Sequence, residues 1–177
     1  MGEIFSTNPH DSLLYSLVSV STVFKIVLIT GQSMSPTLQN GERILAWTPF
    51  SRKQFKRGVI VTLSHIQTYT LNVQSNHYMN RIIIKQKQSE LFIKRLIGLP
   101  GDTVIISVAE LSQQTLLTVD SHARRCGSKL MWHVPNNHVF VRGDGIQSND
   151  SIMWEPVPFS LLKQIVLCRF PSFKEIT

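Results

Sequence analysis

Residues 91–108 read LFIKRLIGLPGDTVIISV and give the clearest secondary-structure signal in the chain. Two apolar runs, Leu91–Ile97 and Thr103–Val108, flank a Gly-Leu-Pro-Gly-Asp turn, which is typical of two β-strands joined by a tight connection. Further strands are predicted over 59–63, 134–142 and 161–169, and residues 23–30 can form a first strand. Residues 64–90 are polar and indicate a loop or a hairpin. Because helical periodicity is scarce after residue 30, we predict a mainly β domain of short strands behind an N-terminal membrane-associated helix.

The predicted strand Leu91–Ile97 carries a lysine, Lys94, among apolar neighbours. A free lysine titrates at about 10.4, and burial can lower its pKa by roughly 3–5 units. The positive charge of the adjacent Arg95 would penalise a charged Lys94 further. Lys94 is therefore a candidate general base, although a surface lysine at a strand edge, with its amine in solvent, is the commoner arrangement.

A candidate nucleophile lies in the octapeptide Gly31-Gln32-Ser33-Met34-Ser35-Pro36-Thr37-Leu38, directly after the apolar run 24–30. Proline fixes one backbone angle and restricts the residue before it, so the Ser33 hydroxyl would stand at a rigid corner. A serine hydroxyl needs a base before it can attack a carbonyl carbon. Ser33 is a nucleophile if Lys94 reaches it, and otherwise an ordinary serine in a strand-to-loop turn.

The third informative stretch runs from Val134 to Asp144 and continues as Gly145-Ile146-Gln147-Ser148-Asn149-Asp150-Ser151. An alternating strand ends there in a Gly-Asp-Gly turn followed by small polar residues. Such a cluster can orient another side chain through hydroxyl and carboxylate hydrogen bonds, or it can be a solvated loop.

Together the three stretches resemble the sequence boxes of the type I signal peptidase family. The members of this family are Ser-Lys membrane proteases. Ser33 to Thr37 matches the Ser-Met-x-Pro-Thr box, and Lys94 to Asp102 matches Lys-Arg-x-x-Gly-x-Pro-Gly-Asp in full. The last box is matched by Gly143-Asp144 and then by Ser148 to Ser151. The resemblance covers roughly residues 24–170 and implies an antiparallel β-fold.

The resemblance also implies roles for individual residues. Ser33 would be the nucleophile, its backbone N–H would bind the oxyanion, and Lys94 would be the base. Ser148 would orient the Lys94 amine. Asp150 would pair with Arg95, and Asp144 belongs to the same supporting box. Gly145 departs from the family's common asparagine.

Within the family the chain looks most like the catalytic subunits of the mitochondrial inner membrane protease. The segment Thr103–Trp132 is too short for the large insertion of bacterial members, and Gly31 stands where many bacterial enzymes have serine. Ile152 favours subunit 2, whereas the compact stretch Thr37–Gly41 is closer to subunit 1. The resemblance implies a mitochondrial inner membrane enzyme whose catalytic domain faces the intermembrane space. Its expected partners are precursor proteins, membrane lipid and a second homologous protease subunit.

Composition is consistent with one membrane-associated domain. The chain has 177 residues, 16% of them charged, with a net charge of +7 and a mean hydropathy of +0.04. The basic balance fits an anionic lipid surface, and no nucleic-acid-binding motif accompanies it, so we expect no nucleic-acid partner. We expect no metal and no cofactor, since no His or Cys pair has ligand spacing. The two cysteines are expected to be free thiols, although one bridge is possible.

The N-terminal boundary is set by hydropathy. Residues 1–24 are interpreted as a tail and membrane anchor, and residues 25–177 as the Ser-Lys protease domain. The run Leu13–Thr30 is uncharged except for Lys25 but contains several hydroxyl residues. Because a span needs about 20 apolar residues, an interfacial anchor is an alternative.

Three other functions are alternatives for a sequence of this kind. The altered last box would suit a catalytically inactive scaffold subunit of the same fold. A bacterial-type signal peptidase I is a second alternative. A self-cleaving Ser-Lys repressor would need a DNA-binding module, for which the segment before Gly31 is too short.

Overall fold

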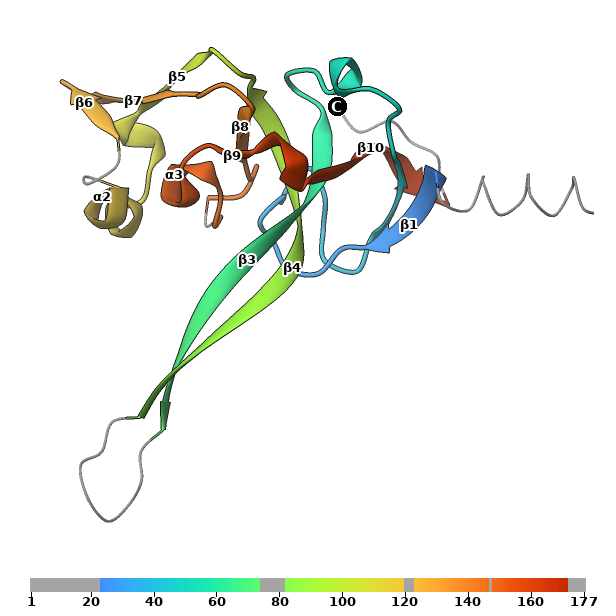
Figure 1. Cartoon of the computed structure of the whole chain (residues 1–177), viewed down its shortest axis with the longest axis horizontal. Helices are drawn as coiled ribbons and strands as arrows, with labels where there is room; N and C mark the ends of the chain where they lie inside the picture. The colour runs from blue at the N-terminus through green and yellow to red at the C-terminus, as the bar shows by residue number, and fades with distance from the viewer. Residues whose placement is uncertain (1–22, 74–81, 120–122, 147, 172–177) are drawn as a thin grey trace, which may run out of the picture.

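The computed structural model describes residues 23–73, 82–119, 123–146 and 148–171 (Figure 1). Its strands form a seven-stranded sheet in the order β1-β2-β10-β3-β4-β8-β9 and a three-stranded sheet in the order β5-β7-β6. Every strand pairing is antiparallel, so the predicted mainly β, antiparallel fold is confirmed. The strands are β1 (Phe24–Leu28), β2 (Arg43–Trp47), β3 (Ile60–Val73), β4 (Ile82–Gly98), β5 (Thr103–Ser107), β6 (Arg124–Cys126), β7 (Lys129–His133), β8 (His138–Arg142), β9 (Val157–Pro158) and β10 (Leu162–Phe170). The helices are η1 (Arg52–Gln54), η2 (Val108–Glu110), α2 (Gln113–Val119), α3 (Ser151–Trp154) and η3 (Phe159–Leu161).

The turn between β4 and β5 carries the chain from the large sheet to the small one. Gly98 packs so closely there that a Cβ atom would lie 2.7 Å from the Val104 side chain and 2.9 Å from that of Phe140. Asp102 fixes the turn by accepting the Leu99 N–H at 2.7 Å and by pairing with Arg57. This turn agrees with the sequence prediction because its Gly-Pro-Gly-Asp chemistry is local.

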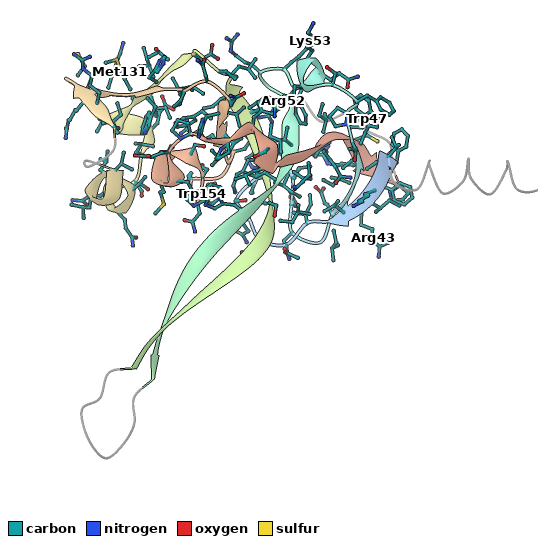
Figure 2. All side chains as sticks on the ribbon, viewed as in Figure 1. Arg43, Trp47, Arg52, Lys53, Met131 and Trp154 are labelled. Atoms are coloured by element: carbon teal, nitrogen blue, oxygen red, sulfur yellow. The ribbon has the colours of Figure 1, made fainter. Side chains whose placement is uncertain are left out.

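In the polar region 64–90 the described residues pair as the two arms of a hairpin, one of the two predicted alternatives. β3 and β4 stay in continuous register from Ile60 opposite Arg95 to Val73 opposite Ile82. Figure 1 shows this two-stranded ribbon projecting far beyond the other strands. At its base, His65 stacks on Trp154 of α3 with ring centroids 4.4 Å apart, and Phe92 lies 5.0 Å from the same ring (Trp154 is labelled in Figure 2).

Three buried clusters hold the sheets together. One lies on the large sheet around Leu63, Leu96 and Val141, and a second joins the small sheet to Phe140. The third contains Met34 and the residues Ile29, Leu38, Ile44, Ile60 and Val166. This third cluster anchors the segment that carries Ser33.

The short helices α2 and α3 were not predicted, because seven and four residues are too few to show a 3.6-residue period. The proposed anchor, residues 1–24, falls outside the described residues except at its last two positions. Among the described residues no helix is both long and apolar enough to cross a bilayer.

Candidate active site

Ser33 lies in a tight loop that follows β1. The loop is closed by backbone bonds from Ile29 N–H to the Glu42 carbonyl at 2.8 Å and from Gly41 N–H to the Ile29 carbonyl at 2.9 Å. Met34 and Leu38 point into the third core cluster and are buried. Burial of the following Met34 fixes the loop and leaves the half-buried Ser33 at the surface of a groove.

Lys94 reaches Ser33 from β4. The Lys94 ammonium donates a hydrogen bond to the Ser33 Oγ at 2.7 Å, although 61 residues separate the two. The Lys94 side chain is 1% exposed, and its Nζ lies 5.8 Å from the centre of the Phe92 ring. The structure therefore brings together the two residues that the sequence analysis selected as nucleophile and base.

Burial changes the charge of this lysine. Desolvation lowers the pKa of Lys94 from 10.5 to about 8, while the negative charges of Asp150 and Asp144 oppose the shift. At neutral pH roughly a tenth of the molecules would then carry a neutral amine, compared with far less than 1% for a free lysine. A neutral amine can accept the proton of the Ser33 hydroxyl, which the ammonium cannot.

Arg95 is paired with Asp144, which corrects the expected pairing with Asp150. The guanidinium makes two parallel bonds to the Asp144 carboxylate, Nε to Oδ1 at 2.9 Å and Nη2 to Oδ2 at 2.7 Å. Burial acts to raise the pKa of Asp144, but hydrogen bonds from Arg95 and the Thr37 hydroxyl hold it below its usual value. Asp144 thus connects β4 to the nucleophile loop. The sequence indicated the right arginine but could not distinguish two carboxylates in one loop.

Asp150 has a different structural role. Its carboxylate accepts the Gly143 N–H at 2.8 Å and the Ile152 N–H at 3.0 Å, and it caps the start of α3. Because Asp150 is almost fully buried, desolvation raises its pKa despite these bonds and the nearby Lys94 charge. The carboxylate therefore fixes the turn after β8 and places a negative charge near the Lys94 amine.

Ser148 lines the groove but does not contact the base in the expected way. Among the described residues its buried Oγ has no partner within ordinary hydrogen-bond geometry, although it is near enough to Asp150 to help lower the pKa of that carboxyl. The structure holds no hydrogen bond between Ser148 and Lys94 among the residues described. The orienting role of Ser148 stays a prediction.

A groove of about 770 Å³ opens over the Ser33–Lys94 pair. One wall is formed by residues 27–34, which end β1 and begin the nucleophile loop. The opposite wall is formed by residues 90–94 of β4, and Ser112 with α2 and Met153 of α3 close further sides. Within the described residues, no three His, Cys, Asp or Glu side chains gather closely enough to hold a metal ion.

One known protein family matches most of the chain. The family described as signal peptidase, peptidase S26, matches residues 12–166 of the chain. The protein belongs to the signal peptidase family. It is therefore a signal peptidase-like serine endopeptidase, a hydrolase.

Three relatives show the breadth of this signal peptidase family. Signal peptidase I of Bacillus licheniformis is 31% identical over 171 residues, covering 83% of this chain and 81% of the relative. Signal peptidase I of Bacillus amyloliquefaciens is 32% identical over 135 residues, covering 69% and 61%. Mitochondrial inner membrane protease subunit 1 of Mus musculus is 25% identical over 154 residues, covering 85% and 71%. Identity is higher with these two bacterial enzymes than with the mouse subunit.

Gly145, where this signal peptidase departs from the family's common asparagine, lies against the nucleophile loop. Its N–H donates to the Ser33 carbonyl at 2.9 Å, and a Cβ atom there would lie 2.6 Å from the Gln32 carbonyl oxygen. Gly143 is more crowded still, since its Cβ would lie 2.1 Å from the Ser148 Oγ and 2.4 Å from the Ser33 carbonyl oxygen. The loop of the last box is thus pressed on the backbone of the nucleophile, and glycine is required at both positions.

Gly145→Ala should lower kcat by about tenfold or more, because a backbone carbonyl beside Ser33 must move and a displacement of about 1 Å can cost 10²-fold. The measurement is kcat on a precursor substrate, and Ile146→Ala is the matched control because that side chain is 89% exposed. Equal kcat values for wild type and Gly145→Ala would show that the close packing has no catalytic role.

Arg169 of β10 is a supporting residue that the sequence did not indicate. It donates to the Thr37 carbonyl and pairs with Glu42 at 3.4 Å, and Glu42 in turn accepts the Gln39 N–H at 2.9 Å. The nucleophile loop is therefore held from one side by Arg169 and from the other by Asp144. Only a family of aligned sequences could have distinguished Arg169 from the other exposed or half-exposed cations.

Arg169→Ala should reduce kcat by about three- to tenfold. Hydrogen bonds to charged groups contribute roughly 1.5–3 kcal/mol, and part of that free energy holds the nucleophile loop in its position beside Lys94. Lys163→Ala, on an exposed position of the same strand, is the control. A change confined to thermal stability, with kcat intact, would assign Arg169 a purely structural role.

Proposed function

We propose that this signal peptidase is a membrane-bound endopeptidase that removes presequences from precursor proteins by a Ser33–Lys94 dyad. The observation that carries the proposal is the 2.7 Å contact between the Lys94 amine and the Ser33 hydroxyl, made by a lysine that is 1% exposed. Neither feature is expected of a lysine that serves solubility or surface pairing.

The chemistry follows from the geometry. Neutral Lys94 takes the Ser33 proton as Oγ attacks the peptide carbonyl carbon, and the resulting ammonium returns a proton to the leaving amine. Water then attacks the acyl-serine ester while Lys94 accepts its proton, and the ammonium returns a proton to the Ser33 Oγ as the acyl C–Oγ bond breaks. The Ser33 N–H has no acceptor among the described residues, so it can donate to the developing oxyanion.

The two walls of the groove suit a substrate in an extended conformation. Ile29 N–H bonds inward to Glu42, so strand alternation turns the backbone polar groups of Leu28 away from β2 and toward the groove side. Leu96 N–H bonds to Val59 at 2.9 Å, and the continuous register then turns the polar groups of Leu91 and Ile93 away from β3. An extended peptide between the walls can hydrogen-bond to both strand edges.

We further propose the mitochondrial inner membrane as the location, with the catalytic domain facing the intermembrane space. The likeness to the mouse inner membrane protease subunit supports this placement, as does the short segment 103–132, whose described residues form β5, η2, α2, β6 and most of β7. Membrane lipid and a second homologous protease subunit are the proposed partners.

The test is cleavage of a presequence-bearing precursor by detergent-solubilised wild type and Ser33→Ala protein, with the new N-terminus identified by mass spectrometry. Wild type should produce one defined N-terminus and Ser33→Ala none. Uncleaved precursor in both samples, with folding verified, would contradict the proposed activity. For location, the protein should be protease-accessible in isolated mitochondria only after the outer membrane is opened; accessibility in intact mitochondria would contradict the placement.

A further inference from the structure

The β3–β4 ribbon extends the wall of the groove well beyond the catalytic pair. The outer edge of β4 pairs with β8 only from Arg95 to Gly98. Residues 90–94 then line the groove, and the same edge continues to Ile82 without another described strand beside it. The eight steps from Glu90 to Ile82 correspond to roughly 27 Å of extended chain.

The alternation of hydrogen bonds along β4 identifies which backbone N–H and C=O groups point outward at this edge. Because Leu96 bonds inward to Val59 and the register is continuous, even-numbered β4 residues bond to β3. The odd-numbered residues turn their N–H and C=O groups outward. Leu91 and Ile93 present these groups to the groove, and positions 89, 87, 85 and 83 repeat the arrangement along the ribbon.

A ribbon of this kind is difficult to explain as an element of stability. Strands of 14 and 17 residues are roughly two and a half to three times the usual length, and two strands without a covering layer are marginally stable in water. Long unpaired edges also invite strand addition, so proteins normally shorten or cover them. Retention of such an edge in line with a peptide-binding groove favours a partner that adds as a strand.

We infer that the outer edge of β4 from Ser89 to Ile82 is an exosite that docks an extended segment of the precursor outside the cleavage site. This inference rests on the proposed function. The occupant is a precursor polypeptide because the edge is continuous with the groove in which the scissile bond must lie. Main-chain hydrogen bonds dominate the contact, so the exosite tolerates many sequences.

The test compares kcat/KM for a precursor with kcat/KM for a peptide of about six residues, which ends within the groove. Lys87→Pro removes an outward N–H from the β4 edge without removing a β3–β4 hydrogen bond. Thr68, the β3 residue paired with Lys87, has its N–H on the opposite edge of the ribbon, so Thr68→Pro is the matched control. Lys87→Gln controls for the lost charge. A third variant replaces residues 68–87 by Asn-Gly, a turn that suits the paired Gln67 and Gln88.

The measured quantity is kcat/KM for the precursor divided by kcat/KM for the short peptide. This ratio should fall about three- to tenfold in Lys87→Pro and further in the variant with the shortened ribbon. Thr68→Pro and Lys87→Gln should keep the wild-type ratio. Short-peptide cleavage reports folding in each variant. An unchanged ratio in the variant with the shortened ribbon would overturn the exosite. If that variant instead lost binding to lipid vesicles or lost self-association while its ratio stayed unchanged, the edge would serve a membrane or a second copy of the chain, which would also overturn the exosite. Failure of wild type to cleave either substrate would instead refute the proposed activity itself.

Discussion

Lys94→Met is expected to abolish cleavage and at the same time to stabilise the folded protein. Loss of a general base typically costs 10²–10⁴-fold in rate, and methionine cannot accept a proton from Ser33. The folded-state pKa of Lys94, about 8, lies below its usual 10.5, so burying the charged amine costs up to about 3 kcal/mol below pH 8. Methionine fills a similar volume without that cost, and we expect a gain of roughly 1–3 kcal/mol at pH 7.

The pH dependence of folding stability gives a second test of the lowered Lys94 pKa. Between pH 8 and 10.5 the unfolded chain binds more protons at position 94 than the folded chain, so wild-type stability rises with pH in that window. The advantage of Lys94→Met should be largest below pH 8 and vanish near 10.5 in denaturant unfolding. Lys163→Met, at an exposed position, should show no such trend. A Lys94→Met protein less stable than wild type at pH 7 would contradict a desolvated lysine.

The rate of cleavage should rise with pH, reach half its maximum near pH 8 and level off about one pH unit higher. Because only the neutral amine accepts the Ser33 proton, kcat/KM should increase about tenfold per pH unit well below the Lys94 pKa, or about fiftyfold from pH 6 to pH 8. The measurement uses a substrate that has no titrating group in this range.

A histidine base would produce a different profile. His65 lies beside Phe92 at the base of the ribbon, and burial lowers its pKa below the ordinary 6.5. A profile that reached its plateau by pH 7 would point to such a group. The His65→Phe variant should keep the wild-type profile, with its midpoint near pH 8.

The sequence predicted those features that local chemistry determines. The apolar runs around Lys94 and the Gly-Pro-Gly-Asp turn predicted β4 and β5, and the order of the three boxes predicted the meeting of Ser33 with Lys94. β4 nevertheless begins at Ile82 rather than Leu91, because continuous pairing with β3 carries a polar segment into the sheet. Tertiary pairing overrides weak local propensity there.

Contacts between distant loops were harder to predict. Two carboxylates stand within a seven-residue stretch near Arg95, and only the backbone of that stretch shows that Asp144 faces the guanidinium while Asp150 turns back to cap α3. Arg169 lies 132 residues from Thr37, and no local pattern connects them. The importance of Gly145 could be seen only once the nucleophile loop was packed against it.

The most direct test of the dyad is a double-mutant cycle on the rate of precursor cleavage with wild type, Ser33→Ala, Lys94→Met and the double variant. Two residues that act as one unit lose nearly everything on the first substitution, so the double variant should be no slower than either single variant. If either single variant keeps a substantial fraction of wild-type activity, or if the two losses multiply, Ser33 and Lys94 are not the catalytic pair.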